Sequence, residues 1–280
     1  MSRATPPPSP ILANKSYDDE SVFTARGLIE AARRHRGLPA SPVPRVCVLD
    51  PDTDLVRHLR DTGRAARDPT WACYHTDLYR LADITGDIGF VGGAVGAPFA
   101  VLVAEQLFAC GCELLISITS AGQLVPLREP PYTILIDRAL RDEGTSYHYE
   151  ASSRFSAMPP DLLAAMAGAF SDLSVPVVTG ATWTTDAPFR ETADVIAARR
   201  DEGLLAVEME AAALYALART RNLPIVCFAV VTNQMAQSDT DFEKGAAHGA
   251  HAALVVINAV SQRFFARRTP NNAPAGATPA

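Results

Sequence analysis

Short apolar runs alternate with helical patterns along most of the chain. The clearest runs are RVCVL at Arg45–Leu49, ELLISIT at Glu113–Thr119 and IVCFAVVT at Ile225–Thr232. Such runs are typical of buried strands. The second run is expected to end at the small residues Ser120, Ala121 and Gly122. Further strands are predicted at Ile88–Gly92, Tyr132–Asp137, Val175–Thr182 and Leu204–Val207.

Helical patterns fill the intervals between these strands. Helices are predicted at Ser21–His35, Thr53–Gly63, Ala97–Cys110, Pro160–Leu173, Ala187–Glu202, Met209–Thr220 and Lys244–Arg267. Alternation of strands and helices favours an α/β fold, in which a mostly parallel sheet is covered by helices on both faces. Ligands of such sheets bind at the carboxyl ends of the strands, so the residues just after each strand are the first candidates for a site.

The two ends of the chain differ in composition from the middle. Residues 1–12 are rich in Pro and Ser, and the last twelve residues read TPNNAPAGATPA. Segments of this composition are candidates for disorder. We therefore expect a partly disordered N-terminal extension with a short helix over residues 1–42, a main domain over residues 43–268, and a disordered tail over residues 269–280.

Composition and charge exclude several classes of protein. The net charge is −6 and only 20% of residues are charged. Proteins that bind nucleic acid typically carry a basic surface, which this composition does not indicate. No apolar run has the length of a membrane span or of a signal peptide's core. The five cysteines contain no CxxC pair, so neither disulfides nor a metal site is expected. The expected location is cytoplasmic.

Two carboxylates flank Met209 where a predicted strand meets a predicted helix. The segment VEMEAAALYALA, Val207–Ala218, contains Glu208 and Glu210. A carboxylate at a strand end can accept hydrogen bonds from two vicinal hydroxyls, such as those of ribose. Acidic residues also stabilise the first turn of a helix. The residues alone leave both interpretations open.

The stretch VEMEAAALY resembles the ribose-binding signature of the nucleoside phosphorylase superfamily, which includes purine nucleoside phosphorylase, uridine phosphorylase and related nucleosidases. The resemblance covers roughly residues 43–268. It implies a three-layer α/β/α fold with a mixed, mostly parallel central sheet that curls partly into a barrel. It also implies that Glu210 holds the ribose 2′ and 3′ hydroxyls, that Met209 lies against the sugar, and that Glu208 lies close to the 2′ side or the base.

A glycine-rich stretch adds to this resemblance. Residues Gly92–Leu124 are similar to the family's glycine-rich turn, helix, strand and small-residue loop. Within them, Gly96 and Ser120 match positions at which the family binds phosphate or ribose. Glycines let a backbone approach a ligand, although a tight turn needed only for packing is the alternative.

A third stretch, TWTTDAPFRET at Thr182–Thr192, is similar to the family's base-binding segment and includes Thr184 as a candidate substrate contact. By this resemblance Phe189 stacks on the base. Arg190 donates to a carbonyl oxygen of the base and stabilises the negative charge of the leaving group. The alternative is that Phe189 belongs to the core and Arg190 pairs with a nearby acid. His148, in the loop SYHY, is a weaker candidate for contacting a sugar hydroxyl.

This chain departs from the family's pattern in two places. Asn233 stands where purine-cleaving relatives carry an Asp, and an amide can donate a hydrogen bond but cannot act as a general acid. This favours a pyrimidine or a 6-oxopurine over adenosine. The family also holds phosphate with three arginines. The corresponding positions here are Thr53, Thr76 and Ser117.

The sequence therefore predicts a divergent nucleoside phosphorylase-type enzyme that cleaves an N-glycosidic bond. Its partner is a small-molecule nucleoside, with no nucleic acid and no membrane, and phosphate is the candidate co-substrate without any other cofactor. Two alternatives stay open. One is a nucleoside hydrolase that uses water with Glu208 as the base, and the other is a nucleoside-binding protein without catalysis. As in the family, we expect a homo-oligomer, either a dimer or a hexamer.

Overall fold

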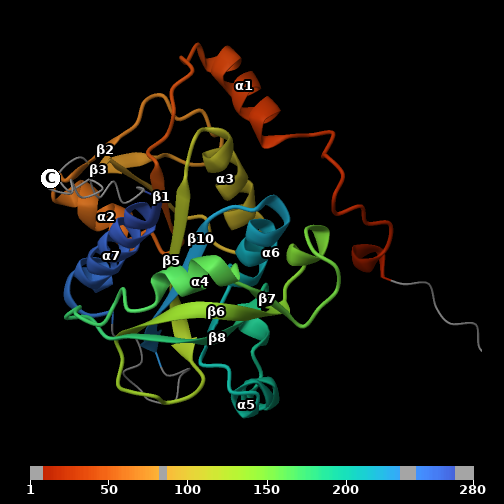
Figure 1. Cartoon of the computed structure of the whole chain (residues 1–280), viewed down its shortest axis with the longest axis vertical. Coiled ribbons are helices and arrows are strands. Elements are labelled where there is room, and N and C mark those ends of the chain that lie inside the picture. The colour runs from red at the N-terminus through yellow and green to blue at the C-terminus, as the bar shows by residue number, and fades with distance from the viewer. Residues whose placement is uncertain (1–8, 82–86, 234–243, 269–280) are drawn as a thin grey trace, which may run out of the picture.

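The computed structural model of the chain describes residues 9–81, 87–233 and 244–268 (Figure 1). Within them lies one ten-stranded sheet with the strand order β10-β6-β8-β9-β5-β1-β4-β3-β2, and β7 pairs with β6. The strands are β1 (Val46–Asp50), β2 (Ala65–Arg67), β3 (Tyr79–Leu81), β4 (Ile88–Gly92), β5 (Leu114–Gln123), β6 (Tyr132–Asp142), β7 (Phe155–Ala157), β8 (Val177–Thr185), β9 (Ala206–Glu208) and β10 (Ile225–Asn233).

Helices cover both faces of this sheet. They are α1 (Ala25–Arg36), α2 (Asp54–Asp61), α3 (Ala97–Ala109), α4 (Pro160–Met166), α5 (Ala193–Asp201), α6 (Ala211–Arg221) and α7 (Ala250–Arg268), with short 3-10 turns at η1 (Pro10–Leu12), η2 (Ser146–His148), η3 (Pro188–Arg190) and η4 (Ala246–Gly249). In Figure 1, α2 and α7 lie on one side of β1 and β5, and α3 and α6 lie on the other. The three-layer α/β/α arrangement with a mixed sheet is confirmed.

Half of the sheet closes on itself. Strand β10 pairs with β5 in parallel and with β6 antiparallel, β6 and β9 each pair with β8 in parallel, and β9 returns antiparallel to β5. These five strands form a closed ring, so the expected partial barrel is present. Strands β1, β4, β3 and β2 extend from β5 as an open wing. Because the ring has no free edge, it is a rigid frame for whatever lies at its rim.

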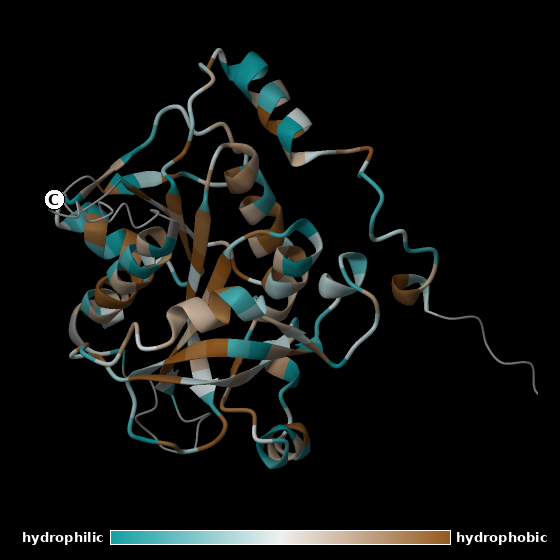
Figure 2. Cartoon of the chain, in the orientation of Figure 1, coloured by the Kyte–Doolittle hydropathy of each residue, from teal (hydrophilic) through white to brown (hydrophobic). Residues whose placement is uncertain are grey.

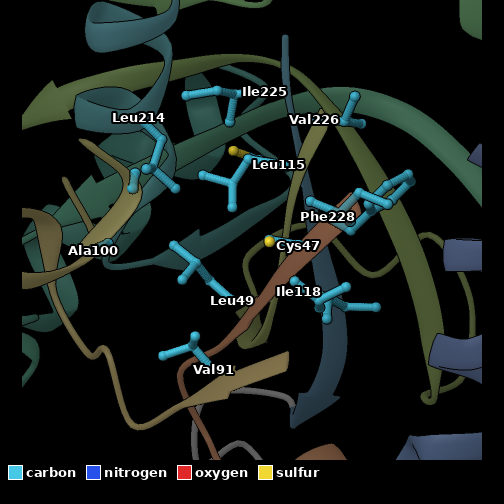
Figure 3. Close-up of a cluster of buried hydrophobic side chains, with 14 of the residues drawn as sticks. Cys47, Leu49, Val91, Ala100, Leu115, Ile118, Leu214, Ile225, Val226 and Phe228 are labelled. Atoms are coloured by element: carbon cyan, nitrogen blue, oxygen red, sulfur yellow. The ribbon is translucent and has the colours of Figure 1, made fainter. Parts of the chain in front are cut away.

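The core follows from the period-two alternation of side chains along the central strands. Hydropathy is highest along these strands and falls toward the outer faces of the helices (Figure 2). One face of β1, β4, β5 and β10 packs beneath α3 and α6, and Figure 3 shows its members Cys47, Leu49, Val91, Leu115 and Ile225 beside Ala100 and Leu214. The other face carries Ile118, Val226 and Phe228. Both faces are therefore dry, as a doubly covered sheet requires.

The N-terminal extension includes a helix that packs on the domain. Thr24 caps α1 by accepting a hydrogen bond from the Gly27 N–H, and Gly37 ends the helix in the left-handed conformation. Ile29 and Ala32 are buried in the main core, against α3. The tail 269–280 lies outside the described residues. No helix in the described ranges is long and apolar enough to cross a membrane.

Several predicted boundaries were wrong for local or tertiary reasons. Strand β6 runs on to Asp142, five residues beyond the predicted Asp137, because β8 pairs with it as far as Asp142, and α1 begins at Ala25 after its cap Thr24. Strand β5 continues through Gln123, because β10 and β9 pair with residues 120–123. Helix α4 ends at Met166, and Gly168 has a positive φ of 73° shortly after it. The predicted helix Ala187–Glu202 consists of two separate elements. The 3-10 turn η3 begins at Pro188, and α5 begins at Ala193. The last helix begins at Ala250, and η4 precedes it.

Three short strands, β2, β3 and β7, were not predicted. Each has three residues, and each pairs antiparallel with a neighbour. Runs of three residues are too short for a periodic pattern to be visible in the sequence. Strands β3 and β7 pair with the longer strands β4 and β6, and β2 pairs with β3, so each depends on a partner strand that lies elsewhere in the sequence.

One buried hydroxyl links helix α6 to two strands of the ring. Tyr215 is fully buried, and its hydroxyl donates to the Ile136 carbonyl at 2.5 Å while accepting from the Cys227 N–H at 3.1 Å. We expect Tyr215→Phe to lower the free energy of unfolding by about 1–3 kcal/mol, because two buried backbone groups lose a partner. Urea denaturation should show a lower midpoint with an unchanged slope. Tyr79→Phe, at a half-buried tyrosine of β3, is the matched control, and equal losses in both variants would contradict this role.

Candidate active site

The carboxyl ends of four parallel strands meet at one edge of the sheet. Strands β4, β1, β5 and β10 run side by side in the same direction. The turn after β1 carries Asp52, and the loop after β4 leads through Gly96 into α3. Strand β9 ends beside the end of β5, and Glu210 is the N-cap residue of α6, which begins at Ala211. Segments far apart in the sequence therefore deliver their polar residues to one place.

Glu208 holds the junction of β8, β9 and α6 together. Its Oε2 accepts from the backbone N–H groups of Glu210 and Ala211, both at 2.7 Å. Its Oε1 accepts from the hydroxyls of Thr182 and Thr184. Glu208 is only 3% exposed, and the chain itself supplies donors to both oxygens. This carboxylate therefore positions the start of α6, and its four acceptor sites are already occupied, so none is left for a water that it could activate.

Thr184 belongs to the same network. Its hydroxyl donates to Glu208 and accepts from the Ala212 N–H at 3.0 Å, so it ties β8 to the first turn of α6. The residue is fully buried. The structure thus places this predicted substrate contact behind the site, where its hydroxyl orients the helix.

Glu210 is the one carboxylate at this edge that is buried and incompletely bonded. It is 1% exposed, and its Oε1 accepts from the Gly96 N–H at 2.7 Å. Its Oε2 has no hydrogen-bond partner among the described residues. Burial raises the pKa of Glu210 to about 8, and the charges of Glu208 and Asp52 act in the same direction. Hydrogen bonds from Gly96 and Thr119 oppose this rise.

The contact between Gly96 and Glu210 joins two motifs that are 114 residues apart in sequence. Gly96 has a φ of 84°, which a residue with a side chain rarely adopts, and this conformation aims its N–H at the carboxylate. Met209, between the two glutamates, is half-buried. A buried carboxylate oxygen without a donor is costly unless a ligand supplies one. Glu210 is therefore suited to accept hydroxyl donors from a bound molecule.

Asp52 and Ser120 form a second contact at this edge. The Ser120 N–H donates to Asp52 Oδ2 at 2.6 Å. The turn that delivers Asp52 is strained, because Thr53 beside it has a φ of 66°, a rare value for a β-branched residue. Asp50, buried just before the turn, accepts from the Val56 N–H, and burial raises its pKa to about 7.

Thr53, Thr76 and Ser117 stand where the family resemblance predicts phosphate-binding arginines, and none of the three side chains carries a charge. Ser117 is buried within β5, and Thr76 accepts a hydrogen bond from the Trp71 indole. Arg154, the arginine of the segment SSRF that leads into β7, pairs with Glu202 at 2.5 Å. Lys244 pairs with Asp54 near the Asp52 turn.

The three base-binding candidates, Asn233, Phe189 and Arg190, come from two different elements, β10 and η3. Asn233 is half-buried at the end of β10, in register with Gly122 of β5, so it reaches the same edge. Phe189 is 99% exposed in η3, and Arg190 beside it is exposed as well. The alternative that Phe189 is a core residue is therefore wrong. In the single chain this aromatic ring stands in solvent.

His148 lies in a different cavity. Its Nδ1 is 2.7 Å from Lys15 Nζ, and it lines a hollow of about 690 Å³ beneath residues 16–26. That hollow shares no lining residue with the cavity at Asp52 and Ser120. The structure does not bring His148 together with Glu210.

Sequence reasoning missed the part played by Asp52. The sequence analysis assigns a meaning only to its neighbour Thr53, as a position without arginine, and none to the carboxylate. It predicts that Ser120 lies just past the end of its strand. No local signal shows that β5 continues to Ser120, because that extension depends on pairing with β10.

Comparison with known proteins identifies the family of this chain. Residues 41–262 match the model of the family described as the Phosphorylase superfamily. A guanosine phosphorylase of Halorubrum lacusprofundi is 29% identical over 237 residues, which cover 80% of this chain and 91% of that protein. A uridine phosphorylase of Thermococcus kodakarensis is 26% identical over 251 residues, covering 82% and 86%.

The fold is shared more widely than the sequence. The crystal structure of purine nucleoside phosphorylase from Toxoplasma gondii in complex with immucillin-H superposes with a TM-score of 0.67 at 14% identity. The match covers 82% of this chain and 94% of that one. The family match spans most of the described domain, and the resemblance of VEMEAAALY is confirmed by it. This chain belongs to the phosphorylase superfamily.

Proposed function

We propose that this protein cleaves the N-glycosidic bond of a nucleoside, as a pentosyltransferase of the nucleoside phosphorylase type. The observation that carries the proposal is the buried Oε2 of Glu210, which lacks a donor among the described residues. Glu208 and Gly96 hold this carboxylate rigidly. Two vicinal ribose hydroxyls would supply the missing donors.

The chemistry follows from this placement. A negative carboxylate beneath the sugar stabilises the positive charge that develops as the N-glycosidic bond breaks. Glu210 would thus both orient the ribose and favour the oxocarbenium-like transition state. A nucleophile then captures the anomeric carbon, and phosphate and water are the two candidates. Hydrogen bonds from Asn233 and Arg190 would stabilise the departing base.

Guanosine and uridine are the first substrates to test. The two relatives in the comparison are named for them. Both bases carry a carbonyl oxygen that accepts a hydrogen bond, so the amide of Asn233 can assist their departure without donating a proton. Adenine lacks that oxygen. We therefore propose a 6-oxopurine or pyrimidine nucleoside as the substrate, in the cytoplasm and without a further cofactor.

Self-association would bury Phe189, the residue proposed to stack on the nucleobase. Phe189 and Val95 are apolar side chains that are 99% and 52% exposed, and Val95 lies in the loop next to Gly96. Exposed apolar groups beside a site favour burial by a second subunit. We propose a dimer or hexamer in which a second copy covers Phe189. Sedimentation that gives only a monomer would exclude this arrangement.

Removal of the Glu210 carboxylate should abolish base release. Two hydrogen bonds to a charged acceptor are each worth about 1.5–3 kcal/mol, so Glu210→Ala should lose roughly 10²–10⁴-fold in kcat/KM. Base release from guanosine, uridine and adenosine, followed by chromatography, measures this loss. Glu113→Gln, an acidic residue at the opposite end of β5, is the control. Near-normal turnover in Glu210→Ala would sink the ribose assignment.

Nucleoside affinity should rise with pH. The pKa of Glu210 is raised to about 8, so the unliganded carboxyl is mostly protonated at pH 6, while two donating hydroxyls require the ionised form. Binding must then release a proton, and affinity should increase up to tenfold per pH unit between about pH 6 and 8. Calorimetry with an uncleavable C-nucleoside tests this dependence. A flat profile in wild type, equal to that of Glu210→Gln, would contradict it.

A further inference from the structure

An N-terminal arm, residues 9–24, lies on the domain and precedes the part of the chain that the family shares. The match to the Phosphorylase superfamily begins at residue 41. Side chains alternate between half-buried and exposed over residues 11–18, with Ile11, Lys15 and Tyr17 among the half-buried ones. In Figure 1 the arm runs from α1 to the loop between β6 and β7, where η1 contacts η2. One side of the arm therefore faces the domain.

The side chain of Ile11 packs on the backbone of Gly144. A Cβ atom at position 144 would lie only 3.2 Å from Ile11 Cδ1, so the isoleucine can approach this closely because Gly144 has no side chain. Four residues further along both segments, Lys15 Nζ lies 2.7 Å from His148 Nδ1, and the ammonium donates to the imidazole. This second contact is exposed, so it contributes less than the packing of Ile11.

Gly144 also contacts the segment that carries the base-binding candidates. Its N–H donates to Asp186 Oδ2 at 2.8 Å. Asp186 begins the segment 186–190, which is exposed throughout and contains Phe189 and Arg190. Ile11 and Asp186 thus contact the same glycine, and the arm is one residue removed from the segment proposed to hold the base.

The loop around Gly144 is held firmly enough to pass this contact on. Glu143 Oε2 accepts from the N–H groups of Thr145 and Ser146, at 2.6 and 2.9 Å. The buried Arg141 donates to the Ser146 hydroxyl at 2.8 Å. Because these bonds fix the loop on both sides of Gly144, a change in the packing of the arm cannot be absorbed there by small local shifts.

We propose that the N-terminal arm positions the base-binding segment, with Ile11 as the positioning residue. This inference rests on the proposed cleavage of a nucleoside. Ile11 holds Gly144, the Gly144 N–H holds Asp186, and Asp186 fixes the start of the segment 186–190. Without the arm this segment samples more conformations, and a bound base has to order it. The arm therefore sets the affinity for the base, while Glu210 acts on the sugar.

Steady-state kinetics of the full-length protein with guanosine and uridine test this role. Ile11→Ala removes the δ carbon that contacts Gly144. KM should then rise roughly tenfold, because two side chains must be ordered on binding, while kcat changes by less than about twofold. Ile11→Leu keeps a δ carbon and should retain a KM near that of wild type. Val22→Ala, at a fully exposed position of the same arm, is the control. An unchanged KM in Ile11→Ala, or a fall in kcat alone, would overturn the inference.

A double-mutant cycle tests the route through Gly144. Asp186→Ala removes the acceptor of the Gly144 N–H, so it should raise KM about as much as Ile11→Ala does. The double variant should be no worse than the poorer single variant, because both substitutions break the same chain of contacts. Multiplied effects in the double variant would show that Ile11 acts independently of Asp186, and this route would be refuted.

Hydrogen–deuterium exchange gives a readout that needs no substrate. In Ile11→Ala, peptides that span residues 141–149 and 185–192 should both exchange roughly tenfold faster than in wild type and in Val22→Ala. Faster exchange in the first peptide alone, or in neither, would overturn the inference whatever the activity. Absence of base release from every nucleoside in wild type would instead overturn the proposed function, while the exchange data would still decide whether the arm holds the segment.

Discussion

The structure of the site depends on how one buried carboxylate is satisfied. Glu208 accepts four hydrogen bonds, two from threonine hydroxyls of β8 and two from the first backbone amides of α6. Those amides would otherwise lack partners at the start of a helix, and the charge suits the positive end of the helix dipole. The network orients the chain between β9 and α6, which leaves Glu210 a single direction in which to point. A residue expected to do chemistry thus supplies the geometry on which the chemistry depends.

Glu210, in contrast to Glu208, is a buried carboxylate whose hydrogen bonds are incomplete. Its burial raises its pKa to about 8, and one of its oxygens has no partner among the described residues. An arrangement of this kind weakens the unliganded fold, since a buried polar atom without a donor costs about 1–3 kcal/mol. The closed ring of β5, β10, β6, β8 and β9 makes the arrangement tolerable, because a frame without edges cannot relax to solvate the carboxylate. In the proposed complex, ribose hydroxyls would supply the missing donor and recover this cost as binding energy.

The sequence was informative where a pattern is local and repeated. The apolar runs at β1, β5 and β10 predicted the central strands. The family resemblance assigned Glu210 and Gly96 each to the ligand site, and the structure joins the two at 2.7 Å. Prediction failed where pairing between distant segments decides the outcome. The extension of β5 to Gln123 depends on β9 and β10, and the contact of Asp52 with Ser120 depends on that extension. Exposure of Phe189 likewise follows from the fold, because an aromatic residue in sequence looks the same whether it is core or surface.

The turn after β1 differs in its electrostatics from the junction that holds Glu210. The family resemblance predicts arginines for phosphate binding, and Thr53, Thr76 and Ser117 stand at the corresponding positions. The Ser120 N–H donates to the Asp52 carboxylate of the neighbouring turn. Asp50, Asp52 and Asp54 line the cavity at this turn together with Lys244 and His248. Glu210 is oriented separately, because its own contacts run to Gly96 and to the Glu208 network at a different strand end.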